Sequence, residues 1–204
     1  MENFEVLKPF GPSIVKIKMP YEMIEEINSY VDKVIQDEKK IKDLDEGDKL
    51  IGKVQQEFLM EIDFMKQIKW AEFLASNVST WAKEDLNKEI KNFQLIKSWV
   101  VRQFKNDYNP VHWHSGDISG VGYLKVPSHL GNTSQPDKKT NENGKLQLIF
   151  GSPNLFSKST YIVKPEIGDF YLFPNYLMHT VYPFTGTDDE RRSVSFNAKV
   201  QFYN

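Results

Sequence analysis

Three histidines carry the most informative chemistry in this sequence. His112 and His114 are two residues apart in the segment that begins at Pro110, and His179 follows downstream. Side chains alternate between the two faces of an extended strand, so His112 and His114 are expected on one face and Trp113 in the core layer behind them. Two imidazoles on one face can chelate a metal ion, although histidines in aromatic-rich strands are also often only packed or solvated.

His179 favours a metal site over simple packing. It follows a short apolar strand, expected at about 169–173, and a loop that would present it at a strand edge. Three protein ligands leave positions open for other molecules on a metal of higher coordination number, as in the facial sites of non-haem Fe(II) oxygenases. The usual facial set has two histidines and one carboxylate, so either His114 replaces the acid or Asp117 supplies it. The sequence leaves both alternatives open.

Arg191 and Ser193 are candidates for binding an anion beside this metal. They lie two residues apart in an expected strand, hence on one face, where they offer a bidentate guanidinium and a hydroxyl. This pair suits a dicarboxylate cosubstrate. The alternative is a surface arginine near the acidic residues 188–190, but its position twelve residues after His179 favours the binding role.

Composition excludes several classes of protein and of site. The chain has 204 residues, with 26 Lys and Arg against 28 Asp and Glu, and this formal charge of −2 favours a small-molecule partner over nucleic acid. Because cysteine is absent, disulfides, zinc-thiolate sites and cysteine nucleophiles are excluded. The sequence contains neither a secretory leader nor an apolar run of membrane-spanning length, which predicts a cytoplasmic protein without a membrane partner. It leaves a homo-oligomer open, since nothing in it forecasts the oligomeric state.

Helices are expected first and strands later, which indicates the α+β class. The expected N-terminal elements are a strand over 13–18, a helix over 20–34, a solvated charged loop over 37–49 and a helix over 63–86. Later strands are expected at about 93–104, 119–126, 145–150, 159–164, 169–173 and 191–202, with a polar loop over 128–144. We therefore expect one domain over 1–204, in which a strand and helices over 1–90 buttress a β-sandwich or barrel over 91–204.

Five short motifs follow one another in the second half of the chain. They are His112-Trp113-His114, Ser119-Gly120-Val121-Gly122-Tyr123-Leu124, Gly168-Asp169-Phe170-Tyr171-Leu172-Phe173-Pro174, His179, and Arg191-Arg192-Ser193-Val194-Ser195-Phe196-Asn197. In these motifs and their order, residues 93–204 resemble the 2-oxoglutarate/Fe(II)-dependent dioxygenase superfamily and, within it, a family of 2OG-Fe(II) oxygenases. The sequence departs from that family at Gly122, where relatives commonly have tyrosine, and in the short interval between His114 and Ser119, which contains Asp117.

The resemblance implies a fold and a metal. The fold is a double-stranded β-helix, which is a jelly-roll or cupin-like barrel. The metal is Fe(II), held by His112, His179 and a ligand at or near His114, with Asp117 the alternative to His114.

The resemblance also implies a cosubstrate and a reaction. Arg191 and Ser193 would bind the distal carboxylate of 2-oxoglutarate, and Tyr123 matches a position that often helps to hold it. Enzymes of this kind use O2 and 2-oxoglutarate to hydroxylate or otherwise oxidise a substrate, with release of succinate and CO2. The protein positions the reactants and excludes water.

Two other functions remain open at this stage. A cupin-like metalloenzyme could use the same barrel and histidines without 2-oxoglutarate, and a non-catalytic metal-binding module could retain the barrel alone. The substrate itself is not indicated. The loop over 128–144 and the N-terminal helices are expected to shape the mouth of the site.

Overall fold

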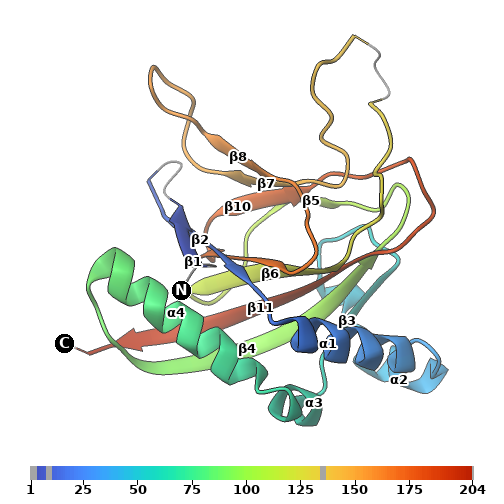
Figure 1. Cartoon of the computed structure of the whole chain (residues 1–204), viewed down its shortest axis with the longest axis horizontal. Coiled ribbons are helices and arrows are strands. Elements are labelled where there is room, and N and C mark those ends of the chain that lie inside the picture. Colours follow the sequence, from blue (N-terminus) through green and yellow to red (C-terminus); the bar gives the residue numbers. More distant parts are fainter. Residues whose placement is uncertain (1–3, 8–10, 134–136, 204) are drawn as a thin grey trace.

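The computed structural model describes residues 4–7, 11–133 and 137–203, whose strands form two antiparallel sheets (Figure 1). The larger sheet has the order β1-β2-β9-β6-β11-β4-β3. Its strands are β1 (Phe4–Leu7), β2 (Ile14–Lys18), β3 (Gln56–Leu59), β4 (Ile90–Gln103), β6 (Ile118–Lys125), β9 (Asp169–Pro174) and β11 (Arg191–Phe202). The smaller sheet has the order β5-β10-β7-β8, with strands β5 (Asn109–His112), β7 (Leu146–Ile149), β8 (Thr160–Val163) and β10 (Met178–Val181). The predicted double-stranded β-helix is confirmed.

Helices cover one face of the larger sheet, and the smaller sheet faces the other (Figure 1). They are α1 (Tyr21–Val34), α2 (Glu38–Leu44), α3 (Ile62–Gln67) and α4 (Trp70–Leu86), with a 3-10 turn, η1 (Gly47–Lys49), after α2. The amphipathic spacing of α1 buries Ile24, Ile27 and Val31 against the sheet, as a helix with one apolar stripe must. The predicted buttressing by helices is therefore confirmed. None of the helices in the described ranges is long and apolar enough to cross a membrane.

Several N-terminal elements differ from those expected. The charged segment 37–49, expected as a loop, contains α2, because the Asp37 carboxylate accepts hydrogen bonds from the amides of Lys39 and Lys40 at 3.0 and 3.1 Å. The helix expected over 63–86 is interrupted at Lys69, whose φ of 53° ends α3 and begins α4. Three strands of the larger sheet, β1, β2 and β3, come from the N-terminal region and not from residues after 90.

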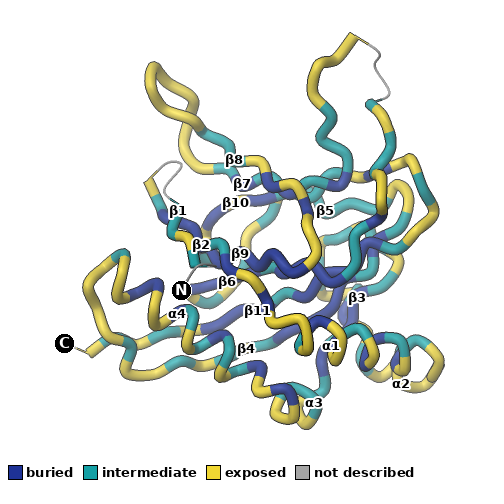
Figure 2. Tube along the Cα trace, viewed as in Figure 1, coloured by how far each residue is buried: buried dark blue, intermediate teal, exposed yellow. Residues whose placement is uncertain are grey.

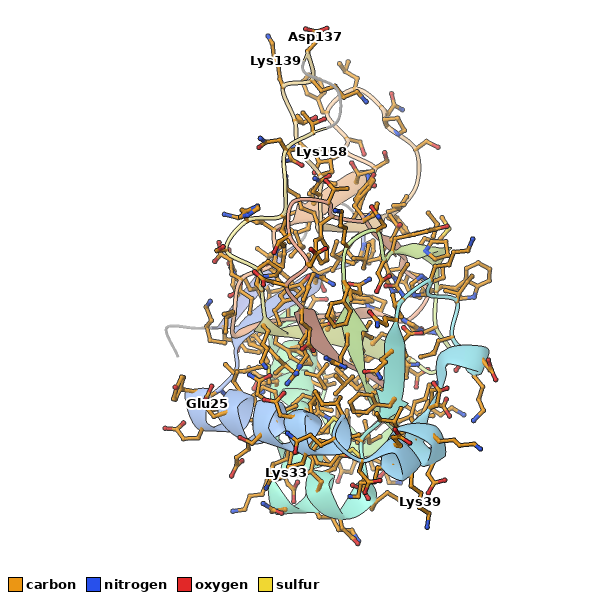
Figure 3. All side chains as sticks on the ribbon, turned by 90° about the vertical axis from the view of Figure 1, so that its right-hand side faces the viewer. Glu25, Lys33, Lys39, Asp137, Lys139 and Lys158 are labelled. Atoms are coloured by element: carbon orange, nitrogen blue, oxygen red, sulfur yellow. The ribbon has the colours of Figure 1, made fainter. Side chains whose placement is uncertain are left out.

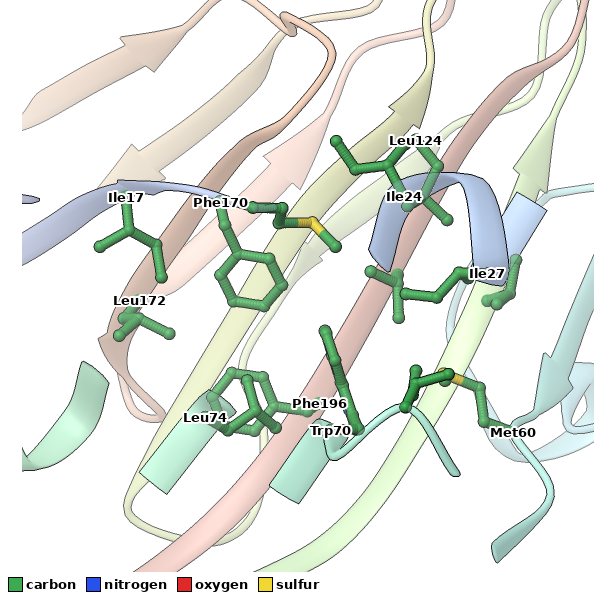
Figure 4. Packing of buried hydrophobic residues seen from close by; sticks show 14 of the residues in the cluster. Ile17, Ile24, Ile27, Met60, Trp70, Leu74, Leu124, Phe170, Leu172 and Phe196 are labelled. Carbon is green, nitrogen blue, oxygen red and sulfur yellow. The ribbon is translucent and has the colours of Figure 1, made fainter. Parts of the chain in front are cut away.

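Alternation along the central strands separates two apolar cores. Side chains on one face of the larger sheet pack against the helices, and side chains on the other face point toward the smaller sheet. Figure 4 shows the helix-side core, with its labelled members Ile17, Ile24, Ile27, Met60, Trp70, Leu74, Leu124, Phe170, Leu172 and Phe196. In Figure 2 the deepest residues follow the large sheet, while the outer faces of the helices and the loops are exposed. The face opposite the helices is thus free to form a site between the sheets.

Gly122 is required by the close packing of the helix-side core. A Cβ at this position would lie 2.2 Å from Cδ2 of Phe170 and 2.8 Å from Sδ of Met19. We expect Gly122→Ala to lower the free energy of unfolding by about 1–3 kcal/mol, because the buried phenyl ring must move. Urea denaturation measures this loss. Gly47→Ala serves as the control and should stay within about 0.5 kcal/mol, since its Cβ meets only the flexible Asp45 carboxylate, at 3.2 Å.

The described residues of the polar loop over 128–144, which are 128–133 and 137–144, project away from the helices. In Figure 3 its labelled residues Asp137 and Lys139 lie at one end of the molecule, and Glu25 and Lys33 of α1 lie toward the other. The base of the loop is held by Asn143, whose Nδ2 donates to the carbonyl of Leu130 at 3.0 Å. The loop therefore extends from the sandwich rather than folding over it.

Candidate active site

Two of the three histidines face each other across a strand pair. His112 on β5 is the direct partner of His179 on β10, and their ring centroids are 4.2 Å apart. Residues directly opposite in an antiparallel pair bring their side chains together on the same face. This register explains why two residues so distant in sequence meet.

His114 reaches the pair although β5 ends at His112. Its amide donates to the carbonyl of Asn175 at 3.0 Å, and Nδ2 of Asn175 donates back to the carbonyl of His114 at 2.9 Å. These reciprocal bonds fix the chain beyond the strand and direct the imidazole inward. The ligand atoms of His112, His114 and His179 all lie within 4.8 Å of one another.

The imidazoles are prepared to act as metal ligands. Nδ1 of His112 donates to the carbonyl of Pro110 at 2.7 Å, and Nδ1 of His179 donates to the carbonyl of Leu177 at 2.9 Å. A carbonyl only accepts, so each of these rings carries its hydrogen on Nδ1 and presents a lone pair at Nε2. Burial, followed by the neighbouring imidazoles, lowers the pKa of His114 and of His179 to about 3. Neutral imidazole is the form that binds metal.

Asp117 does not join this cluster. It is exposed, and its Oδ2 accepts a hydrogen bond from the amide of Val200 at 2.9 Å. Its own amide donates to the carbonyl of Ala198 at 2.8 Å, which ties it to the end of β11. Of the two alternatives for the third ligand, the structure therefore brings His114 to the other histidines and directs Asp117 elsewhere.

A row of side chains on the larger sheet faces the histidines. Tyr123 on β6 pairs with Ser193 on β11, which pairs with Val101 on β4, which in turn pairs with Glu57 on β3. Arg191 lies two residues before Ser193 and hence on the same face. The three predicted anion-binding residues, Tyr123, Arg191 and Ser193, line one cavity with the three histidines.

Arg191 and its neighbour Arg192 are both buried but differ in their partners. Arg192 contacts the Glu190 carboxylate at 2.6 Å and the Asp32 carboxylate at 2.7 Å. Arg191 donates to the side-chain oxygen of Gln103 and stacks on the Tyr123 ring at 5.1 Å, and it forms no ion pair with the described residues. A buried cation without a carboxylate is costly unless an anion joins it.

Two buried polar atoms beside Arg191 also lack partners in the described structure. They are its own Nε and the hydroxyl of Tyr123, which is fully buried. Burial raises the pKa of Tyr123, so the hydroxyl stays protonated and available as a donor. Guanidinium, phenol and the Ser193 hydroxyl together form a donor set that fits a carboxylate.

The cavity has a volume of about 300 Å³ and opens between the two sheets. Its mouth is lined by Lys49, Leu50 and Ile51 from the N-terminal region and by Val111 and Trp113 next to the histidines. Trp113, expected in the core, is 66% exposed and lies just after β5, an edge strand of the smaller sheet. The four α-helices and the described part of the 128–144 loop contribute no lining residue, whereas η1 contributes Lys49.

Sequence reasoning did not identify three polar residues of the cavity wall: Glu57, Gln103 and Asn109. Gln103 could have been found, because it continues the alternation of Trp99 and Val101 along β4 and pairs with Arg191. Asn109 lies between Asn106 and Pro110, a composition typical of turns, and Glu57 lies in a segment for which no strand is predicted. No signal in the sequence separated either from ordinary surface residues.

Residues 97–197, about half of the chain, match the model of a family described as "putative 2OG-Fe(II) oxygenase". This match contains the three clustered histidines and the predicted anion-binding residues Tyr123, Arg191 and Ser193. A search of curated proteins found no match.

Solved structures share the fold at low sequence identity. A prolyl-4-hydroxylase of Pseudomonas putida has 12% identity and a TM-score of 0.57, over 94% of this chain and 93% of that chain. HygX of Streptomyces hygroscopicus with nickel, 2-oxoglutarate and hygromycin B has 12% identity and a TM-score of 0.58, over 94% and 84%. The viral collagen prolyl hydroxylase of Paramecium bursaria Chlorella virus-1 has 16% identity and a TM-score of 0.53, over 91% and 94%.

Proposed function

Since the chain belongs to the 2-oxoglutarate/Fe(II)-dependent oxygenase superfamily, we propose that His112, His114 and His179 hold Fe(II) in the cavity between the sheets. The donor set fits this ion, because imidazole is a common ligand of iron and all three rings are neutral. Three protein ligands would leave further coordination positions of the ion free. Open positions are what a cosubstrate and O2 require.

The cosubstrate in this proposal is 2-oxoglutarate, with its distal carboxylate at Arg191, Ser193 and Tyr123. The observation that supports this cosubstrate is the buried guanidinium of Arg191. Its Nε has no hydrogen-bond partner, and it forms no ion pair with a carboxylate among the described residues. Charge pairing and two further donors would stabilise a carboxylate there. A dicarboxylate could then extend from Arg191 toward the histidines, which line the same cavity.

The proposed reaction is oxidation of a C–H bond in a second substrate, with release of succinate and CO2. Fe(II), 2-oxoglutarate and O2, when bound, supply the oxidising power. The chain itself binds the reactants, orients them and shields them from water. Phe173 packs edge-on to His179 at 5.0 Å, and Trp99 packs edge-on to His114 at 5.6 Å. These rings restrict the imidazoles to one orientation and keep water from the ligand set.

An anaerobic ultraviolet–visible titration of the Fe(II)-loaded protein with 2-oxoglutarate tests this function. We expect the weak visible metal-to-ligand charge-transfer band of the chelate to appear and to saturate. If the protein takes up iron but never shows the band, the cosubstrate is wrong and a cupin-like metalloenzyme without 2-oxoglutarate is favoured. If the protein retains no iron, a non-catalytic module is favoured.

The domain organisation, the cellular location and the oligomeric state of the protein stay predictions from the sequence. We propose that residues 1–204 act as one domain, that the protein is cytoplasmic and that its partners are small molecules. Nucleic-acid binding is not proposed, since the formal charge of −2 provides no general attraction to phosphates. Analytical ultracentrifugation would determine whether the chain forms a homo-oligomer.

A further inference from the structure

A buried carboxylate, Glu57, faces the same cavity as the histidines. It lies on β3 and is only 3% exposed. Asn109 donates a hydrogen bond to its carboxylate, and the second oxygen, Oε2, has no partner among the described residues. Gly52 covers this pair so closely that a Cβ there would lie 2.6 Å from Nδ2 of Asn109. Glu57 therefore presents one buried acceptor atom without a partner on the cavity wall.

A chain of side-chain hydrogen bonds joins Glu57 to the proposed cosubstrate site. Oδ1 of Asn109 accepts from Nε2 of Gln103 at 2.8 Å, and Oε1 of Gln103 accepts from the Arg191 guanidinium. Glu57 and Arg191 thus occupy opposite ends of one polar row. Gln103 and Asn109 separate the acid from the arginine, so the two charges do not neutralise each other directly.

A second buried acid nearby shows what Glu57 lacks. Glu46 is 5% exposed, and its carboxylate contacts the ammonium groups of Lys49 at 2.6 Å and of Lys97 at 3.4 Å. These lysines lower the pKa of Glu46, whereas burial raises the pKa of Glu57 to about 7. Lys49 and Lys97 are thus both paired with Glu46. Lys97 lowers the pKa of Glu57 only from a distance, and neither lysine forms an ion pair with Glu57 among the described residues. A buried carboxylate left without a cation is costly and typical of a binding site.

Apolar and aromatic side chains adjoin Glu57 at the mouth of the cavity. Trp113 is 66% exposed and Ile51 is 53% exposed, and both line the cavity with Glu57. Exposed tryptophan faces attract organic cations, and apolar side chains pack the hydrocarbon part of such a ligand. A carboxylate behind an aromatic rim is a suitable arrangement for recognising a cationic organic molecule.

We propose that Glu57 is a specificity-determining residue that binds a protonated amine or guanidinium group of the primary substrate. The hydrocarbon part of that substrate lies against Trp113 and Ile51. The inference rests on the proposed function, because only in an oxygenase does this cavity hold the molecule to be oxidised. It assigns a chemical class, an organic cation, to a substrate that the fold leaves open.

Calorimetric titration of matched small probes into the anaerobic Fe(II) and 2-oxoglutarate complex tests the inference. The amines are benzylamine and n-butylamine, and the neutral counterparts of similar size are benzyl alcohol and n-butanol. We expect each amine to bind about tenfold more tightly than its alcohol, as for a charge-assisted hydrogen bond in a buried site. Glu57→Gln should remove this preference, and the control variant Glu61→Gln should keep it, because the Glu61 carboxylate pairs with Lys40 and does not line the cavity.

Several outcomes of these titrations would contradict the inference. If the amines bind no better than the alcohols, fail to bind at millimolar concentration, or keep their preference in Glu57→Gln, the inference is wrong. It is also wrong if benzamide binds better than benzylamine, because Glu57 would then act as a neutral donor. Loss of the band in the wild type contradicts the proposed function, whereas loss of the amine preference alone contradicts only this inference.

Discussion

Replacing Arg191 by alanine is expected to raise the Kd for 2-oxoglutarate by on the order of 100-fold, with little loss of bound Fe(II). The guanidinium is 2% exposed and pairs with no carboxylate of the described chain, so a bound dianion would be its main electrostatic partner. The histidines lie on other strands and keep their own hydrogen bonds. Anaerobic titration of the charge-transfer band measures the Kd, and metal analysis after gel filtration measures the iron.

Two further variants separate the role of Arg191 from general effects of removing an arginine. Arg191→Lys keeps the charge but not the planar fork, so its Kd should lie between those of wild type and Arg191→Ala. Arg102 neighbours Gln103 on β4, faces the other side of the sheet and pairs with Glu190 at 2.7 Å. Arg102→Ala should lower stability and leave the Kd unchanged. Equal Kd values for Arg191→Ala and wild type would rule out the proposed cosubstrate position.

Elements with a regular apolar period could be predicted, and elements interrupted by functional or charged residues could not. The helix α1 and the long strands β4, β6 and β11 could be predicted, because apolar residues recur along each of them at the spacing of the element. The strand β3 was missed because its cavity face carries Glu57, which breaks the apolar alternation beside the buried Phe58. Only the folded chain shows that a charged residue there points into a site.

Candidate site residues could be found by type, but their geometry depends on how the sheets close. The His112 and His179 partnership requires the register of β5 on β10, which pairs segments separated by most of the barrel. The exposure of Trp113 could not be predicted either, because the sequence does not show that β5 lies at the edge of the smaller sheet. Likewise, His114 and Asp117 both carry a potential metal ligand shortly after His112 in the sequence. A hydrogen bond to Asn175 holds His114 beside the other histidines, and a hydrogen bond from Val200 holds Asp117 away from them. No local sequence pattern reveals either bond.

Removal of the His114 imidazole is expected to abolish tight iron binding, and changes at Asp117 are expected to leave it intact. In His114→Ala the affinity for Fe(II) should fall by more than about 100-fold, the upper end of what loss of an outer-shell partner costs. His114→Asp should recover part of this loss, since a carboxylate completes the usual facial set. Iron retained after dialysis against a chelator, measured by mass spectrometry of the metal, reports the affinity.

Asp117→Asn provides the decisive comparison, because the amide oxygen of asparagine can still accept from the Val200 amide that Asp117 binds at 2.9 Å. The fold is therefore kept while the carboxylate is removed. If Asp117→Asn loses iron and His114→Ala keeps it, the ligand set is two histidines and an acid, and the chain near 113–117 must rearrange when metal binds. If the reverse holds, the centre is a set of three neutral imidazoles. The dianionic cosubstrate beside Arg191 would then carry most of the negative charge that balances the metal, which couples retention of the cosubstrate to that of the iron.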